Sequence, residues 1–195
     1  MDNAIKLQPD YALAYMLRGV GYHQLGWAKV AIEDFDKAIR LKPDAAGAYG
    51  NRGFAYSELG QDKRAIEDYT EAIRLWPDNA IIYIKRGDVY KRLYQYQRAI
   101  EDYTEAIRLE PDKAEAYVCR GTVYVGSLGQ YQRAIEDFDK AIRLEPDNAN
   151  AYNNRGATYL LWQGNNNLGC SDVQKACGLG SCTALKRAKQ EGYCP

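Results

Sequence analysis

Apolar residues recur along the chain at a spacing typical of helices. The segment RAIEDYTEAIRL (64–75) places its apolar residues on one stripe of an α-helix: Ala65, Ile66, Tyr69, Ala72, Ile73 and Leu75. The same segment recurs at 98–109, and close variants occupy 30–41 and 133–144. The pattern therefore predicts an all-α protein that uses one amphipathic helix several times.

The copies return every 34 or 35 residues, and a proline followed by aspartate marks each return: Pro9, Pro43, Pro77, Pro111 and Pro146. Because proline cannot continue a helix and aspartate caps the start of the next one, each period predicts two helices. Tyrosine, glycine and alanine recur in register between the prolines. A fixed period of this length predicts a solenoid, in which each helix pair buries its apolar face against its neighbours.

The order of these residues resembles the tetratricopeptide repeat (TPR) family. The first four periods carry Tyr, Gly-x-x-Tyr, Ala, an aromatic residue, Ala and Pro, as begins at Tyr49, Gly53 and Tyr56 in the second period. The resemblance covers about residues 12–163, with repeats that start near residues 12, 46, 80, 114 and 149. It implies an all-α fold, a right-handed α-solenoid of antiparallel helix pairs known as the TPR superhelix.

Two positions depart from this repeat. Tyr94 stands where the third repeat would carry its turn glycine, and the fourth repeat has one extra residue in the segment VGSLG (125–129). We expect the extra residue to lengthen the turn or to bulge the first helix of that repeat, without breaking the stack.

The start of the chain resembles the end of a repeat. Residues 1–8 align with the back half of a second helix, so we interpret them as the remnant of an upstream repeat and expect the chain to be a fragment of a longer array. Solenoids need polar caps at their ends. The apolar residues Ala4, Ile5 and Leu7 therefore favour self-association through this open N-terminal end.

The last part of the chain, residues 164–195, predicts a degenerate second helix of the fifth repeat and then a capping helix. The second helix is entered through a predicted turn, GNNNLG (164–169), and the capping helix spans 182–194. Leu185 and Ala188 are expected to face the stack. Cysteine-bearing end helices of this type resemble those of some bacterial TPR arrays.

Four of the five cysteines lie in this last part. Cys170 and Cys177 are two helical turns apart, about 10 Å, which is too far for a disulfide. An antiparallel hairpin favours the nested structural disulfides Cys170–Cys194 and Cys177–Cys182, which would favour an extracytoplasmic location, periplasmic or secreted. Free thiols remain an alternative, and so does a four-cysteine zinc site, although no C-x-x-C pair supports it.

Each repeat also carries one arginine on its first helix and one aspartate on its second helix. Because the planar guanidinium fork suits a carboxylate, we expect structural ion pairs within or between repeats. The alternative is a row of arginines that binds anions. The arginines are Arg18, Arg52, Arg86, Arg120 and Arg155, and the aspartates are Asp34, Asp68, Asp102, Asp137 and Asp172.

The TPR resemblance implies a concave groove, lined by the first helices, that holds a peptide or another partner segment. The implied groove residues are Leu13, Met16, Leu17, Val20, His23, Gln24, Asn51, Phe54, Ser57, Glu58, Ile81, Lys85, Asp88, Lys91, Arg92, Glu115, Val118, Thr122, Asn150, Asn153 and Asn154. The alternative is that these positions form solvated helix faces. Co-chaperone TPR domains grip a carboxylate through five groove positions, and only Asn51 and Lys85 match them here, so chaperone tails are not the expected partner.

Charge and composition exclude several other functions. With 26 basic and 26 acidic residues the net charge is zero, which gives no attraction to nucleic acid. No apolar run approaches the roughly 20 residues that span a bilayer. His23 is the only histidine and no glycine-rich phosphate loop is present, so we expect neither an enzyme nor a cofactor or metal site.

The sequence therefore predicts a non-enzymatic protein–protein interaction module whose partner is a protein or peptide of unknown identity. The alternative is a structural spacer, or a scaffold that assembles through end-to-end stacking of repeats.

Overall fold

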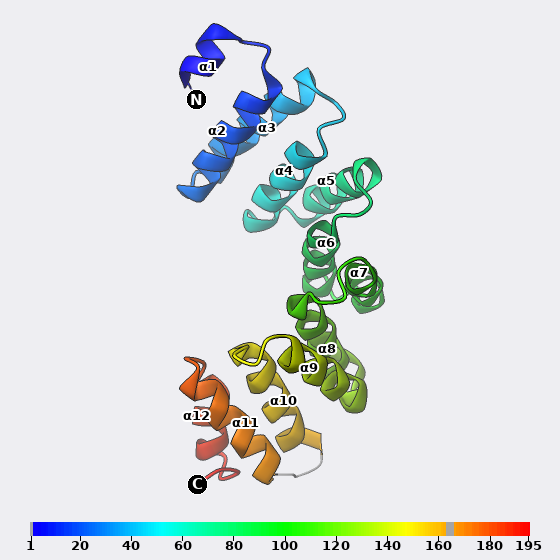
Figure 1. The fold of residues 1–195 in the computed structure, drawn as a ribbon, viewed down its shortest axis with the longest axis vertical. Coiled ribbons are helices and arrows are strands. Elements are labelled where there is room, and N and C mark those ends of the chain that lie inside the picture. The colour runs from blue at the N-terminus through cyan, green and yellow to red at the C-terminus, as the bar shows by residue number, and fades with distance from the viewer. Residues whose placement is uncertain (1, 163–165) are drawn as a thin grey trace. The chain divides into compact units, whose positions relative to one another are not determined.

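The computed structural model of the chain describes residues 2–162 and 166–195, and within these residues it contains helices and no β-strand. Figure 1 shows the helices in chain order. They are α1 (Asp2–Leu7), α2 (Ala12–Gln24), α3 (Ala28–Leu41), α4 (Ala46–Glu58), α5 (Asp62–Leu75), α6 (Ala80–Arg92), α7 (Tyr96–Leu109), α8 (Ala114–Leu128), α9 (Tyr131–Leu144), α10 (Ala149–Trp162), α11 (Asn166–Gly178) and α12 (Thr183–Gln190).

The helices form two compact units, residues 1–95 and residues 96–195. In the first unit, α2 pairs with α3 and α4 pairs with α5, while α6 packs on α5 (Figure 1). In the second unit, α8 pairs with α9 and α10 pairs with α11, while α7 packs on α8 and α12 packs on α10 and α11. Each unit is thus a stack of antiparallel helix pairs, and the predicted all-α solenoid class is confirmed.

Glycine on a first helix and an aromatic ring on its partner set how closely the two helices of a pair approach. A Cβ at Gly19 would lie 2.7 Å from Cε1 of Phe35, and a Cβ at Gly121 would lie 2.7 Å from Cε1 of Phe138. Both rings are fully buried. The recurrence of glycine in the sequence therefore reflects packing, because any side chain there would push the ring out of the core.

The turn at Tyr94 has the same left-handed backbone conformation as the equivalent turns that contain glycine. Tyr94 has φ 60°, close to the values of 81° at Gly26 and 69° at Gly60 in the equivalent turns. A side chain with a Cβ is strained in this left-handed region. The third repeat therefore carries a strained residue where the others use glycine.

The extra residue of the fourth repeat lengthens its first helix. Helix α8 has 15 residues, whereas α2, α4 and α6 have 13 each. The helix ends at Gly129, whose φ of 58° stops it by a left-handed turn. The packing of α8 on α9 is retained.

The prediction of a turn over residues 164–169 is wrong for residues 166–169, because α11 already begins at Asn166; residues 164 and 165 lie outside the described part of the chain. Close packing explains the difference. A Cβ at Gly169 would lie 2.6 Å from the Leu160 side chain, so α11 uses this glycine to approach α10. The predicted capping helix 182–194 is also shorter than expected, because α12 ends at Gln190 and Gly192, with φ 76°, turns the chain back.

Candidate functional site

An open groove lies in the first unit between the first helices α4 and α6. It has a volume of about 400 Å³, and helix α5 with the residue after it closes its floor. The walls come from α4 and α6 and the floor from the segment 69–76; the lining residues are Ala46, Gly47, Gly50, Asn51, Phe54, Tyr69, Ala72, Trp76, Asn79, Ile81, Ile82 and Lys85. The groove therefore belongs to the second and third repeats.

Large apolar side chains in this groove remain open to solvent. Phe54 is 39% exposed, Ile81 is 46% exposed and Trp76 is 55% exposed. Single exposed apolar residues are common on proteins, but several around one concavity mark an interaction site. Asn51 and Lys85 add polar groups to the lining of the same pocket.

Glycine shapes the wall of the groove. A Cβ at Gly50 would lie 2.9 Å from Cδ1 of Ile82, so α4 and α6 are in close contact at this point. At the floor, Tyr69 is buried, and burial raises the pKa of its phenol well above the usual value. The ring therefore stays uncharged at physiological pH and forms a neutral floor.

A second, smaller pocket continues the groove toward the C-terminal ends of α4 and α6. It has a volume of about 230 Å³ and shares Phe54, Tyr69 and Lys85 with the first pocket. Its other lining residues are Ser57, Glu58, Asp88 and Arg92. The groove thus changes along its length from an apolar part to a charged part.

The charged side chains of this second pocket already bind one another or their neighbours. Nε2 of His23 lies 2.7 Å from a Glu58 carboxylate oxygen, and the His23 ring packs edge-on to Phe54 at 5.0 Å. Arg92 is bound to Asp62 and donates to Oγ of Ser57 at 2.9 Å. These contacts fix the rim of the groove and leave the apolar part as its open surface.

The structure brings together the predicted groove residues of the second and third repeats. Asn51, Phe54, Ile81 and Lys85 line the first pocket; Phe54, Ser57, Glu58, Lys85, Asp88 and Arg92 line the second. Lys91 pairs with Asp88 at 3.2 Å. In the first repeat Leu13, Leu17 and Gln24 are exposed on α2.

Other predicted groove residues serve packing between or within repeats. Met16 and Val20 are half-buried against the core cluster of α3 and α4, and Val118 packs in the same way against the cluster around Tyr117. The side chains of Met16, Val20 and Val118 therefore pack against the protein interior and do not form an open groove surface.

In the second unit, the first helices line a pocket that is smaller than the groove between α4 and α6. Thr122 and Asn154 line a pocket of about 150 Å³ between α8 and α10. The side-chain oxygen of Asn153 accepts the backbone N–H of Ala184 at 3.3 Å, so the capping helix α12 already binds this residue. Glu115 and Asn150 are exposed.

Sequence reasoning missed the floor of the main groove. Trp76 directly follows the second helix α5, and its equivalents before the repeat prolines are polar: Lys42, Glu110 and Glu145. Ile82 likewise stands at a position that is alanine in every other repeat. These departures from the repeat were visible in the sequence, and they could have indicated which repeats line the groove.

The predicted arginine–aspartate pairs within each unit are present as ion pairs. Nε and Nη2 of the arginine bind the two carboxylate oxygens at 2.7–2.9 Å in Arg18–Asp34, Arg52–Asp68, Arg120–Asp137 and Arg155–Asp172. The fifth pair, Arg86–Asp102, joins residues of different units and stays a prediction.

These arginines also bind the preceding repeat, which the sequence analysis did not foresee. Nη1 of Arg52 lies 2.5 Å from Asp36, and Nη1 of Arg155 lies 2.6 Å from Asp139. In the other copies the same position is a threonine, and Arg86 and Arg120 donate to Thr70 and Thr104 at 3.0 and 3.1 Å (Oγ1). Arg52, Arg120 and Arg155 therefore each join two repeats, which favours the structural role over an anion-binding row.

Burial and hydrogen bonding act in opposite directions on these pairs. Burial raises the pKa of the Asp68 carboxyl, while the hydrogen bonds from Arg52 lower it. The bonds to Asp68 and Asp36 raise the pKa of the Arg52 guanidinium further above its already high value. The two short hydrogen bonds from the guanidinium to the Asp68 carboxylate make the contact a partly buried ion pair.

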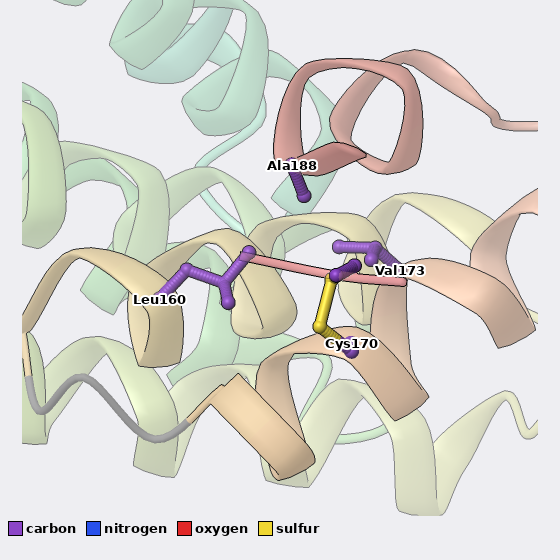
Figure 2. Close-up of a cluster of buried hydrophobic side chains, with 5 residues drawn as sticks. Leu160, Cys170, Val173 and Ala188 are labelled. Carbon is purple, nitrogen blue, oxygen red and sulfur yellow. A yellow bond between two sulfur atoms is a disulfide. The ribbon is translucent and has the colours of Figure 1, made fainter. Parts of the chain in front are cut away.

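The four C-terminal cysteines are joined in the nested pattern that the hairpin geometry favours. Cys170 is bonded to Cys194 and Cys177 to Cys182, with Cα–Cα distances of 5.6 and 4.0 Å. Figure 2 shows Leu160, Val173 and Ala188 converging around Cys170 in the same cluster. Across the described residues, no group of three or more His, Cys, Asp or Glu side chains could hold a metal ion.

In the described part of the chain, no helix has the length and apolar character needed to cross a membrane.

The stacked helix pairs and the groove beside them define a helical-repeat protein. Family comparison makes this specific: the model of the TPR repeat matches residues 55–93, 95–126 and 127–161, and a second tetratricopeptide repeat model matches residues 12–45. The chain belongs to the tetratricopeptide repeat family.

Solved structures of TPR proteins are similar to this chain over nearly its whole length. YrrB, described as a TPR protein with an unusual peptide-binding site, is 24% identical with a TM-score of 0.76, and the match covers 96% of this chain and 97% of YrrB. MamA is 27% identical with a TM-score of 0.75, covering 88% and 96%. The pilF protein of Pseudomonas aeruginosa is 21% identical with a TM-score of 0.82, covering 93% and 85%. No curated protein matches the sequence.

Proposed function

We propose that the chain is a non-enzymatic interaction module that binds a segment of a protein partner in the groove between α4 and α6. A large apolar side chain of the partner inserts between Phe54, Trp76 and Ile81. The single observation that carries this proposal is the exposure of these side chains around one concavity of about 400 Å³. Such a surface loses its unfavourable contact with water only when a partner covers it.

The chemistry of the groove indicates how a segment would be held. Aromatic residues in a pocket typically contribute most of the affinity at an interface. Asn51, at the side of the apolar part, can exchange hydrogen bonds with the backbone of an extended segment. The paired charges at the far end of the groove, such as Glu58 with His23, form a polar rim. The partner therefore carries one bulky apolar anchor within an extended, weakly charged segment.

The proposal is tested by selecting short random peptides, displayed on phage, that bind the immobilised chain. The substitution Trp76→Glu removes the apolar floor and introduces the residue that other repeats carry at this position. We expect selected peptides to contain a large apolar residue and to bind the variant about tenfold more weakly or worse, a loss of about 1.4 kcal/mol.

Trp27→Gln is the matched control for this experiment. Trp27 is as exposed as Trp76, at 55%, but lies before α3 and outside the groove, and glutamine is the residue of the other repeats at this position. Peptides that lose the same affinity for both variants, or for neither, would contradict binding in the groove.

A self-assembling scaffold is the second candidate function, and exposed apolar residues at the N-terminal end favour it. Leu7, Tyr11, Leu13 and Leu17 are all exposed on or between α1 and α2. Repeats of a solenoid bury such faces against their neighbours, so a second copy could cover them. The mass of the chain in solution, considered in the Discussion, separates this function from peptide binding.

We also propose an extracytoplasmic location for the chain. The two joined cysteine pairs near the C-terminus support it, because disulfides persist in oxidising compartments. Mass spectrometry of the protein isolated from its natural source without reductant tests this proposal. Alkylation of all four C-terminal cysteines in that material, in addition to the free Cys119, would contradict it.

A further inference from the structure

We propose that α12 is a cap locked by disulfides, and that a dithiol reductant releases it in two ordered steps. The reductant opens Cys177–Cys182 first and Cys170–Cys194 second, and only the second step frees α12 from the end of the stack. This inference does not depend on the peptide groove of the first unit.

Packing alone gives α12 few contacts. The helix has eight residues, and among them only Ala188 is buried, while Ala184 and Leu185 are half-buried. A helix of this length is unstable by itself in water. Its position on α10 and α11 therefore depends on covalent attachment to the rest of the second unit.

The two disulfides hold different parts of this cap. Cys177–Cys182 closes the short turn between α11 and α12, with a sequence separation of 5. Cys170–Cys194 joins the interior of α11 to the residue after the turn at Gly192, with a separation of 24. Opening the first bond leaves the cap attached at its far end, whereas opening the second removes the last bond that holds it down.

Access to the sulfur atoms sets the order. Cys177 and Cys182 are both half-buried at the turn, whereas Cys170 and Cys194 are both buried in the cluster with Leu160 and Val173 (Figure 2). A disulfide is cleaved by in-line attack of a thiolate on one sulfur, so a buried pair reacts more slowly than a half-buried one.

The chemistry of each step is complete with a dithiol. One thiolate of the reductant attacks a protein sulfur, which forms a mixed disulfide and releases the other protein sulfur as a thiolate. The second thiol of the reductant then displaces the protein from the mixed disulfide. The protein disulfide gains two electrons and two protons, and the dithiol becomes a cyclic disulfide.

Release of α12 changes the end of the second unit. The buried side chains of Leu160 and Val173 lose their cover, and Asn153 loses the N–H that it accepts from Ala184. The surface that appears is the face on which a further helix pair stacks in a solenoid. The cap is thus a redox-controlled cover over an apolar end face.

The experiment follows the reduction of the full chain by dithiothreitol over time. Samples are quenched by alkylation, and peptide mass spectrometry measures the alkylated fraction of each cysteine. Hydrogen exchange of the backbone amides in α12 is measured on the same time course. The expected result is that Cys177 and Cys182 are alkylated about tenfold faster than Cys170 and Cys194, and that α12 loses its protection only with the second pair.

Two double variants separate the bonds without a reductant. C177S/C182S is expected to keep α12 protected from exchange, whereas C170S/C194S is expected to lose this protection while α8 and α9 keep theirs. The protection of α8 and α9 shows that the variant is folded. Equal rates for the two pairs, α12 amides that stay protected after full reduction, or four free thiols in untreated protein would overturn the proposal.

Discussion

Single residues decide how closely the helices approach and how the chain turns between them. Gly19, Gly53 and Gly121 on the first helices leave room for the buried rings of Phe35, Tyr69 and Phe138. The turn residues need a left-handed backbone, which Gly26 and Gly60 adopt without strain and Tyr94 adopts with strain. Substitutions at these positions should therefore have effects that their exposure alone would not suggest.

The substitution Tyr94→Gly is expected to stabilise the chain by about 1 kcal/mol, because it removes the strain of a Cβ at φ 60°. Gly60→Ala is the matched control, since it places a Cβ at φ 69° where no atom within 4 Å obstructs it. It is expected to destabilise by a similar amount, about 1 kcal/mol.

Urea unfolding measures the stability of both variants. A Tyr94→Gly variant that is less stable than the parent would show that the Tyr94 side chain stabilises the fold by more than its backbone strain destabilises it.

The arginines that bind two repeats lead to a second prediction at this scale. Arg52→Ala leaves the buried Asp68 and the half-buried Asp36 without their guanidinium, and it is expected to lower the free energy of unfolding by about 3 kcal/mol.

Arg74→Ala is the control for Arg52→Ala, because Arg74 pairs with Glu71 on the surface and is 65% exposed, whereas Arg52 is 19% exposed. Its effect is expected to stay within about 0.5 kcal/mol. Thermal or urea unfolding compares the two variants. Equal small effects would mean that the arginines of the repeat are dispensable for stability and available for other roles.

At the scale of helices, the sequence predicted the elements well where the repeat is regular. The stripe of apolar residues in 64–75 and the proline after it predict a helix there, and α5 spans Asp62–Leu75. Prediction was poorer after residue 163. The asparagines and Gly169 are weak helix formers, which suggested a turn, but tertiary contact with Leu160 places Gly169 inside α11. Local propensity does not contain such contacts.

The two disulfides give a prediction about the C-terminal elements. In the chain-entropy description, a bond between residues 24 apart stabilises by about 3.5 kcal/mol and one between residues 5 apart by about 2 kcal/mol. C170S/C194S is therefore expected to lower the stability of the second unit more than C177S/C182S does. Calorimetric or urea unfolding without reductant measures both; the reverse order would contradict the role of Cys170–Cys194 as the main bond of the cap.

At the scale of the whole molecule, the sequence predicted the fold and only part of the site. The period of 34 or 35 residues predicts a solenoid, and the order of the recurring tyrosine, glycine, alanine and proline residues carries the resemblance to the TPR family. The groove depends instead on where copies differ. Trp76 and Ile82 form it with Phe54, although Trp76 follows a second helix and the other two lie on first helices, so only the stacking of helices brings these side chains together.

The mass of the chain in solution distinguishes the two candidate functions. An interaction module that needs a separate partner is expected to remain at 22.0 kDa as its concentration rises. A scaffold that stacks end to end would grow in mass with concentration, through the exposed Leu13 and Leu17. Size-exclusion chromatography with light scattering measures this. Growth that Leu13→Gln with Leu17→Gln abolishes would favour the scaffold over the module.

The most direct test of the account is nitrogen-15 NMR of the three tryptophan indoles while a selected peptide is added. The account predicts that the indole N–H signal of Trp76 shifts as the groove fills, while the signals of Trp27 and Trp162 stay in place. A bound peptide that shifts Trp27 or Trp162 and leaves Trp76 unchanged would contradict binding in the groove between α4 and α6.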